Sequence, residues 1–197
     1  MKAKISDKNS KLGKIMNVSL PPVTTCRPGA PCAKDCYAMK AWHMYPSVRK
    51  AWSHNLDCVK VNWGKFFDSI IEQINGKKNT PRFFRWHVSG DILDKEYFAG
   101  MIDVARRCPD TIFLAFTKRY NIVNDMTDHI PENLTIIFSA WPGLEMENKN
   151  HFPVAWFDDG TDNRIPEDCI ECPGLCDSCG MCFQLGRIGK DVRFKKH

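Results

Sequence analysis

Closely spaced cysteines constrain this chain more than any other feature, because eight of its ten cysteines fall into two short segments. The first group is Cys26, Cys32 and Cys36, with five and then three residues between successive thiols. A Pro-Gly pair and a second proline lie between them and bend the backbone so that the sulfurs can converge. A closed structural zinc site has four protein ligands. Three thiolates therefore predict a centre with one open coordination position, on a metal ion or on one iron of a [4Fe-4S] cluster.

The second group of cysteines lies near the C-terminus, with gaps of two, three, two and two residues. Its members are Cys169, Cys172, Cys176, Cys179 and Cys182. Two Cys-x-x-Cys pairs this close together are unlike a zinc ribbon, in which a longer hairpin separates the pairs. The spacing is more typical of iron–sulfur ligands. It predicts a second [4Fe-4S] cluster, with zinc as the alternative at this site, and leaves one thiol to spare.

The sequence has no signal-peptide pattern and no apolar run of about 18 residues or more, which predicts a cytoplasmic protein with no membrane partner. Disulfides are rare in that compartment, so ligation of a metal or cluster is the better interpretation of the cysteines. Cys58 and Cys108 lie among apolar residues in helical patterns and are interpreted as core residues. The formal net charge of +5 permits a nucleic-acid partner without requiring one.

Apolar periodicity predicts an α/β protein in which strands alternate with helices, as in parallel βαβ units. Strands are expected at 15–20, 82–92, 112–116 and 134–139, with a further one at 154–157. Helices are expected over 37–75 in two pieces, the second capped by Ser47, then after Asp94 and at 122–129. Residues 1–13 are interpreted as a polar arm with little to bury. These elements are too few for a complete barrel, so we predict a shortened, partial (β/α) barrel over residues 1–157. A cysteine-rich, metal-binding segment with a basic tail follows over residues 158–197.

The expected strand at 82–92 alternates between apolar and polar side chains. One face carries Phe84, Trp86 and Val88. The alternate face carries Arg85, His87, Ser89 and Asp91. This pattern predicts that the polar face lines a cavity.

The loop after the first expected strand, closed by Cys36-Tyr37-Ala38, resembles the cluster-binding loop of the radical S-adenosylmethionine superfamily, although the superfamily spacing is usually three and then two residues. Ser89-Gly90-Asp91 stands where that superfamily has a Gly-Gly-Glu element. Thr117-Lys118-Arg119 and Ser139 follow later strands, where it often places polar cofactor contacts. More closely, the chain is similar to the gene product 88 type family of phages and plasmids, which has this loop near its start and a cysteine-rich end.

The resemblance implies a [4Fe-4S] cluster on the first three cysteines that binds S-adenosylmethionine and cleaves it reductively to a 5′-deoxyadenosyl radical. It implies cofactor contacts from six residues. These are Ser89, Gly90, Asp91, Lys118, Arg119 and Ser139. Arg85 and His87 then become catalytic candidates on the substrate side. An electron donor of flavodoxin or ferredoxin type is expected as a partner, and the family context makes a nucleotide or nucleic acid the favoured substrate.

Other interpretations remain open at this stage. The first three cysteines could bind zinc with His43 as a fourth ligand. Asp91 could serve in helix capping, Lys118-Arg119 could be a solvated pair, and His87 could be a core histidine. The alternative function is a zinc-stabilised nucleic-acid-binding or adaptor protein without catalysis, and a further one is a non-catalytic iron–sulfur redox protein. The adaptor would contact phosphates through Lys77, Lys78, Arg106, Arg107 and the tail cations Arg187, Lys190, Arg193, Lys195 and Lys196.

Overall fold

One parallel sheet organises the chain, and it is seen here in a computed structural model that describes residues 1–8 and 11–195. Its strands in chain order are β1 (Met16–Val18), β2 (Phe83–Trp86), β3 (Ile112–Thr117), β4 (Leu134–Ala140), β5 (Val154–Asp158), β6 (Ile170–Glu171) and β7 (Val192–Lys195). They lie side by side in the order β1-β2-β3-β4-β5-β7-β6, and each neighbouring pair is parallel. The predicted α/β class with parallel strands is confirmed. The final segment, from residue 158 onward, supplies two strands of this same sheet.

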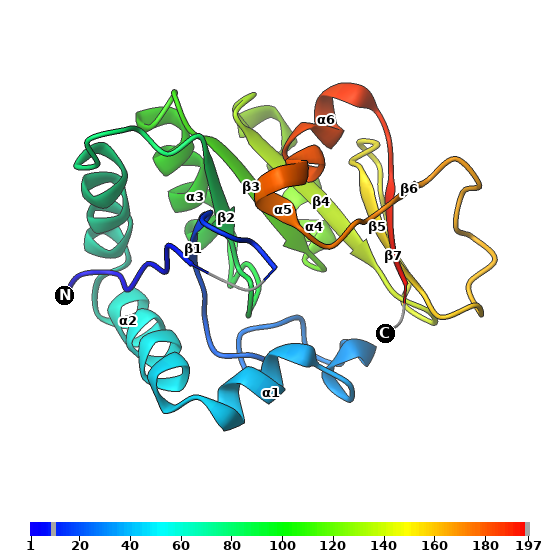
Figure 1. The fold of residues 1–197 in the computed structure, drawn as a ribbon, viewed down its shortest axis with the longest axis horizontal. Coiled ribbons are helices and arrows are strands. Elements are labelled where there is room, and N and C mark those ends of the chain that lie inside the picture. The colour runs from blue at the N-terminus through cyan, green and yellow to red at the C-terminus, as the bar shows by residue number, and fades with distance from the viewer. Residues whose placement is uncertain (9–10, 196–197) are drawn as a thin grey trace.

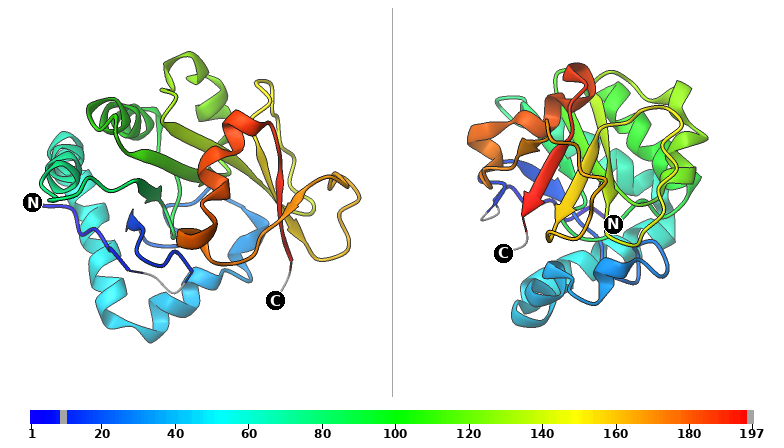
Figure 2. Two further views of the ribbon diagram at one scale, coloured as in Figure 1. Left: turned by 45° about the horizontal axis from the view of Figure 1, so that its top comes forward. Right: turned by 90° about the vertical axis from the view of Figure 1, so that its right-hand side faces the viewer.

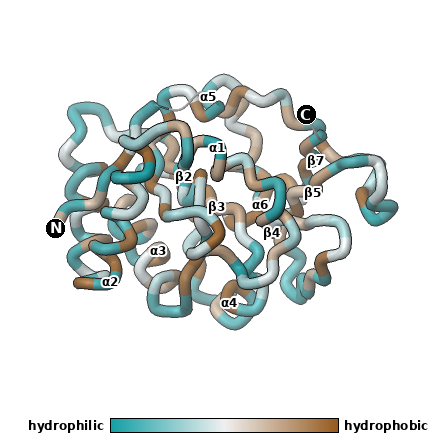
Figure 3. The backbone as a smooth tube through the Cα atoms, turned by 90° about the horizontal axis from the view of Figure 1, so that it is seen from below, coloured by the Kyte–Doolittle hydropathy of each residue, from teal (hydrophilic) through white to brown (hydrophobic). Residues whose placement is uncertain are grey.

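The helices lie on both faces of the sheet and below one edge of it (Figure 1). They are α1 (Tyr37–Met44), α2 (Pro46–Asn75), α3 (Lys95–Arg107), α4 (Tyr120–Asn124), α5 (Cys176–Cys179) and α6 (Leu185–Ile188), with the 3-10 turns η1 (Pro31–Ala33), η2 (Thr127–His129) and η3 (Met181–Gln184). Seen from below, α5 lies on one side of the strands and α3 and α4 on the other (Figure 3). In the described ranges, no helix combines the length and apolar character that a membrane span requires.

The helical face of the sheet, covered by α2, α3 and α4, carries the larger core. On α2, Phe66, Phe67, Ile70, Ile71 and Ile74 are buried, whereas Trp63 of the same expected stripe is 51% exposed. The apolar residues of α3 are buried as well. Aromatic rings join the two helices to β2, because Phe67 packs edge-on against both Trp86, at 6.0 Å between centroids, and Tyr97, at 5.1 Å. Asp94 caps α3 as predicted, its side chain accepting a hydrogen bond from the Tyr97 amide at 2.7 Å.

The opposite face, which we call the cysteine face, is covered by residues 11–15 and by the C-terminal segment. Its core contains Leu12, Ile15, Leu114, Ile137, Ala155, Phe183, Leu185 and Val192, together with half-buried cysteines of the second group. Figure 2 shows the C-terminal segment stacked against this side of the strands. Phe183 stacks on Phe83 of β2 with 4.3 Å between ring centroids. The cysteine-rich segment therefore packs directly on the sheet.

Three boundaries predicted from the pattern are wrong. The arm over residues 1–13 does bury side chains, since Ala3 and Leu12 are 3% and 5% exposed; residues 9 and 10 lie outside the described ranges. Its scattered apolar residues show no periodicity, so their burial depends on surfaces supplied by distant segments. Helix α2 begins at Pro46 with Tyr45 as its N-cap, which places Ser47 inside the first turn rather than at the cap. Strand β2 ends at Trp86 instead of continuing to residue 92.

Candidate functional site

The first cysteine loop joins β1 to α1 and lies at the carboxyl ends of the strands, toward which the arrowheads point in Figure 1. Turns shape the loop. The Cys26 amide donates to the Val23 carbonyl at 3.2 Å, and Gly29 takes a positive φ of 72° that suits a residue without a side chain. Cys32 lies within η1, and Cys36 is the N-cap residue of α1. The Pro-Gly-Pro composition thus produces the bends expected of it.

The three thiols of this loop lie within electrostatic range of one another. Burial is the main cause that raises the pKa of Cys26 to about 11, and Asp91, Cys36 and Cys32 raise it further while a backbone hydrogen bond from Val23 lowers it. A thiol in this state stays protonated at neutral pH unless a cation or cluster takes the place of its proton. Across residues 1–8 and 11–195, no group of three or more His, Cys, Asp or Glu side chains is placed to hold a single metal ion.

Two arginines tie the loop to the end of β3. The Arg119 guanidinium donates to the Cys26 carbonyl at 3.1 Å, and Arg27 donates to the Lys118 carbonyl at 3.5 Å. Arg27 also lies over the Tyr120 ring, 5.3 Å from its centroid. The first cysteine is therefore held beside the strand end where the sequence predicted cofactor contacts.

Gly90 makes a close backbone approach possible on the other side of the loop. Its φ is +84°, and a Cβ built there would lie 2.6 Å from the Thr25 hydroxyl and 2.8 Å from the Leu20 Cβ. The neighbouring Ser89 carbonyl accepts a hydrogen bond from the Leu20 amide at 3.0 Å. Ser89-Gly90-Asp91 thus packs against the start of the cysteine loop, as a glycine at this position allows.

Asp91 joins the ends of β2 and β3. Its carboxylate accepts hydrogen bonds from the Thr117 hydroxyl at 2.6 Å, the Lys118 amide at 2.9 Å and the Ile92 amide at 2.7 Å. Burial raises the pKa of Asp91, and these three donors lower it. The predicted capping role belongs to Asp94 instead. With three donors already on its oxygens, Asp91 positions the loop ends.

Lys118 and Ser139 come together at the ends of β3 and β4. The Lys118 ammonium donates to the Ser139 hydroxyl at 2.8 Å and lies 5.5 Å from the centroid of the Trp141 ring. The Ser139 carbonyl accepts from the Tyr120 hydroxyl at 2.6 Å. Nearby, the hydroxyl of Ser89 is buried and has no hydrogen-bond partner among the described residues. The Lys118 ammonium, which has three N–H groups, and the Ser89 hydroxyl can therefore donate hydrogen bonds to a ligand at this edge.

Arg85 lies on the cysteine face, between the two groups of cysteines. Its Nε donates to the Trp86 carbonyl at 2.9 Å, and its guanidinium covers the Phe116 ring at 4.1 Å from the centroid. Burial lowers the pKa of Arg85, while Tyr37 on one side and Cys182 and Cys176 on the other raise it.

Tyr37 supplies the contact with the first loop. The residue is 67% exposed, but its hydroxyl points inward and donates to the Val88 carbonyl at 2.5 Å. Burial of that hydroxyl raises the pKa of Tyr37, Arg85 lowers it, and the thiols of the first loop raise it further. The Tyr37 hydroxyl thus lies within electrostatic range of both Arg85 and the first cysteine group.

His87 does not share the face of Arg85, so the predicted alternation fails directly after Trp86. Its φ is +54°, which turns the ring toward the helical face, where Nε2 lies 3.0 Å from the Tyr97 hydroxyl. Burial, and then the charge of Arg85, lowers the pKa of His87 to about 3. Val88 correspondingly packs with the core of the cysteine face. This placement agrees with the alternative of a core histidine.

The second group of cysteines divides in a way that spacing alone did not reveal. Cys172, Cys176, Cys179 and Cys182 line one cavity of about 50 Å³, with Arg85 and Phe116 of the sheet in its wall. Cys169 lies elsewhere, against Ile165 and the small core of β4 and β5. Burial raises the pKa of Cys169 to about 11, and the charges that act on it are those of Asp191, Asp168, Arg193 and Lys190. The sequence could not identify Cys169 as the separate cysteine, because its position depends on packing against β4 and β5, which are distant in the chain.

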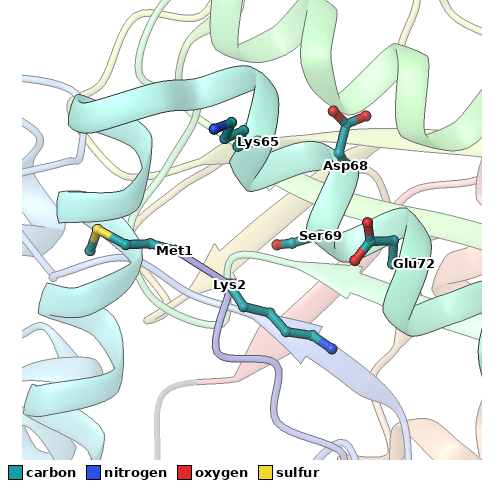
Figure 4. A pocket seen from close by; sticks show the side chains of 6 residues that line it. All are labelled: Met1, Lys2, Lys65, Asp68, Ser69 and Glu72. Carbon is teal, nitrogen blue, oxygen red and sulfur yellow. The ribbon is translucent and has the colours of Figure 1, made fainter.

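The remaining predicted groups lie apart from these two sites. His43 is exposed on α1, and the thiols of Cys58 and Cys108 are buried beside His54 and Asn75. Three of the tail cations are paired: Lys190 with Asp168, and Arg193 and Lys195 with Glu171. Lys196 lies outside the described residues. A groove of about 420 Å³ beside α2 is lined by Met1, Lys2, Lys65, Asp68, Ser69 and Glu72, and it contains none of the predicted site residues (Figure 4).

Comparison with known proteins connects the chain to a group of phage proteins. A family profile described as Gene product 88 matches residues 1–185. The Gene 88 protein of Mycobacterium phage D29 is 26% identical over 181 residues, which cover 77% of this chain and 75% of that protein. The Gene 88 protein of Mycobacterium phage L5 is 25% identical over 185 residues, covering 77% and 74%. No solved structure matches.

Proposed function

Because the chain belongs to the gene product 88 family, whose matched region includes both groups of cysteines, we propose one function for that shared region: an iron–sulfur enzyme of radical S-adenosylmethionine type. In this proposal the sheet is a shortened, partial (β/α) barrel, and its site lies at the carboxyl ends of β2, β3 and β4. Parallel sheets place their sites at that edge, which supports the location.

The observation that carries the proposal is the position of the Cys26–Cys36 loop. Cys32 and Cys36 both lie close enough to Cys26 to act on it electrostatically, and Arg119 donates to the Cys26 carbonyl at the end of β3. The donor set fits an iron–sulfur cluster, because thiolates are soft ligands and three of them leave one iron free. When bound, the cluster and S-adenosylmethionine would supply reductive cleavage of the sulfonium to a 5′-deoxyadenosyl radical, which abstracts hydrogen from a substrate.

Residues of the strand ends have separate roles in this proposal. Lys118 would pair its ammonium with the carboxylate of the methionyl group, and the Ser89 hydroxyl would hydrogen-bond to the ligand. Ser139 orients Lys118 through the hydrogen bond at 2.8 Å. Arg119 holds the cysteine loop through its hydrogen bond to the Cys26 carbonyl. Gly90 leaves room for the start of that loop, because it has no side chain. Asp91 acts as a positioning residue, since its oxygens already accept three hydrogen bonds.

The catalytic candidates on the substrate side differ in what supports them. Arg85 remains a candidate because its guanidinium is near Tyr37 of the first loop. His87 is set aside, because its ring is buried against Tyr97 on the helical face. An external electron donor of flavodoxin or ferredoxin type, a nucleotide or nucleic-acid substrate and a cytoplasmic location complete the proposal.

The first prediction tests this function with the Cys32→Ala variant. The full chain is purified without oxygen, reduced with dithionite and assayed for 5′-deoxyadenosine from S-adenosylmethionine. We expect the wild type to produce 5′-deoxyadenosine and the rate of production by Cys32→Ala to be at least 100-fold lower, which corresponds to about 2.7 kcal/mol or more in activation free energy. The reason is that two thiolates cannot hold the cluster and keep its free iron in place.

Cys169→Ala is the matched control, since that thiol packs with the small core of β4 and β5 rather than with the first loop or the other four cysteines of the second group, and it should retain the activity. Undiminished 5′-deoxyadenosine production by Cys32→Ala would refute the proposal. Colourless wild-type protein that contains zinc and no iron would instead support the zinc-stabilised adaptor.

A further inference from the structure

We propose that Cys172, Cys176, Cys179 and Cys182 form a closed iron–sulfur site against the sheet, with Arg85 as its charge partner and Cys169 outside it. The four thiols line one cavity, and Arg85 of β2 lies in the same wall. This inference does not depend on the activity proposed for the first loop, because it concerns a different set of ligands on the cysteine face.

The local fold explains why these four thiols face one cavity. Helix α5 is a single turn that carries Cys176 and Cys179 three residues apart, and Gly180 ends it with φ +60° and a hydrogen bond from its amide to the Cys176 carbonyl. The chain then turns through η3, which contains Cys182 and packs over β3 and β4. Cys172 enters from the other side, its amide bonded at 3.0 Å to the Arg193 carbonyl of β7.

Contacts with the rest of the molecule hold this turn in place. Phe183, next to Cys182, is 3% exposed and stacks on Phe83. The Cys176 amide donates to the Lys11 carbonyl at 3.0 Å, so the N-terminal segment anchors the start of α5. The ligands thus stand on segments packed against the sheet, as a preorganised site requires.

Packing supports the same grouping of four. Cys172, Cys176, Cys179 and Cys182 are half-buried around one cavity, with Arg85 in its wall. Cys169 packs instead with the small core of β4 and β5. Four thiolates are the ligand set that a closed iron–sulfur cluster takes. A cluster spans more space than one ion, which suits thiols arranged around a cavity rather than converged on a point.

Arg85 is the positive side chain in the cavity wall. Its guanidinium is held there by the hydrogen bond from Nε to the Trp86 carbonyl and by the Phe116 ring. A cluster with four thiolates carries a net negative charge that grows on reduction. A fixed cation beside it stabilises the reduced form more than the oxidised form, and therefore raises the reduction potential. Arg85 is in this role a positioning residue for charge rather than a ligand.

The experiment isolates the second site by replacing Cys26, Cys32 and Cys36 together with alanine in the full chain. After anaerobic reconstitution with iron and sulfide, we expect about four irons per chain in this background. Adding Cys176→Ser should remove the iron, whereas adding Cys169→Ser should leave it unchanged. Circular dichroism of each variant establishes that the sheet is intact. Adding Arg85→Gln should keep the iron but lower the midpoint potential in a redox titration, and Arg85→Lys should largely restore it.

Three results would overturn the inference. One is zinc in place of iron after reconstitution with both metals present. Another is loss of iron from the Cys169→Ser variant while its sheet is intact. The third is a midpoint potential that Arg85→Gln leaves unchanged, which would remove Arg85 from the site. An inactive first loop affects none of these readouts, so failure of the proposed function and failure of this inference are distinguishable.

Discussion

At the scale of single residues, His87 combines two unfavourable features. A non-glycine residue at φ +54° occupies the left-handed region, which costs about 1 kcal/mol or more, and the buried ring keeps one nitrogen, Nδ1, without a hydrogen-bond partner among the described residues. The hydrogen bond to Tyr97 and the packing beside Trp86 offset these costs. The turn it makes ends β2 and sends Ser89-Gly90-Asp91 toward the cysteine loop. His87 therefore shapes the site without entering it.

The low pKa of His87 predicts how stability responds to acid. Its folded-state pKa of about 3 lies below the value of about 6.5 expected in the unfolded chain, so the unfolded chain binds the proton first. The contribution of the neutral His87 ring to the unfolding free energy is complete above about pH 6.5 and is lost as the pH falls toward 3. Between pH 7 and pH 5, wild type should lose about 2 kcal/mol more unfolding free energy than His87→Asn.

Urea denaturation of metal-free protein at the two pH values measures this difference. Asparagine is the matched replacement, because it tolerates positive φ but does not titrate. Carboxylates titrate equally in both proteins and cancel in the comparison. Equal acid sensitivity of the two proteins would mean that the ring is accessible to protons in the folded chain.

At the scale of elements, the packing of α2 against α3 depends on a glycine. A Cβ on Gly100 of α3 would lie 2.1 Å from the Phe67 ring of α2, whereas one on Gly64 would meet only the Asn62 side chain, at 3.5 Å. Alanine gains about 1 kcal/mol of helix propensity in a helix interior such as Gly100, and less at Gly64, which lies in the first turn after the kink at Asn62. At Gly100 the clash, about 1 to 3 kcal/mol for an overpacked core, outweighs that gain.

We therefore expect Gly100→Ala to lower the unfolding free energy by about 1 to 2 kcal/mol and Gly64→Ala to raise it by up to about 1 kcal/mol. Urea unfolding of both variants and of the wild type measures the two changes in unfolding free energy. A stabilised Gly100→Ala variant would show that α3 moves away from Phe67 at little cost.

The same scale shows what periodicity could and could not predict. Strands β1, β3, β4 and β5, and helices α2 and α3, followed from apolar patterns, because each buries a run or stripe of apolar residues. Helix α1 was predicted too, although Ala38 is the one buried residue among its eight, all of which the structure describes. The two-residue β6 and the four-residue β7 are too short for periodicity to identify, and the pairing of β7 with β5 and of β6 with β7 is a tertiary effect. Residues 87–92 misled the prediction because alternation continued in the sequence after the backbone had left the strand. For the site, spacing found both cysteine groups but not the separation of Cys169.

At the scale of the whole molecule, the cysteine face explains why the last segment behaves as part of the fold. Strand β5 hydrogen-bonds to β7 on its outer side, with Ala155 opposite Val192. Phe183 and Leu185 cover Leu114 and Ile137, which belong to β3 and β4. Burying one such aromatic side chain is worth about 2 to 3 kcal/mol, a large share of the stability of a domain of this size. Removing the segment would open an entire face of the sheet to water.

A chain that ends at residue 157 is therefore expected not to fold cooperatively, although the sequence pattern placed a boundary there. Far-UV circular dichroism during heating should show no sharp transition, and the dye ANS, which binds exposed apolar surface, should fluoresce far more strongly than with the full chain. The physical reason is specific: β5 loses its partner, and the residues beneath Phe183 lose their cover. A sharp melt of the shortened chain near that of the intact protein would mean that residues 1–157 are a domain in their own right. In that case the cysteine-rich segment would have to be treated as an appendage, with the second metal site belonging to it alone.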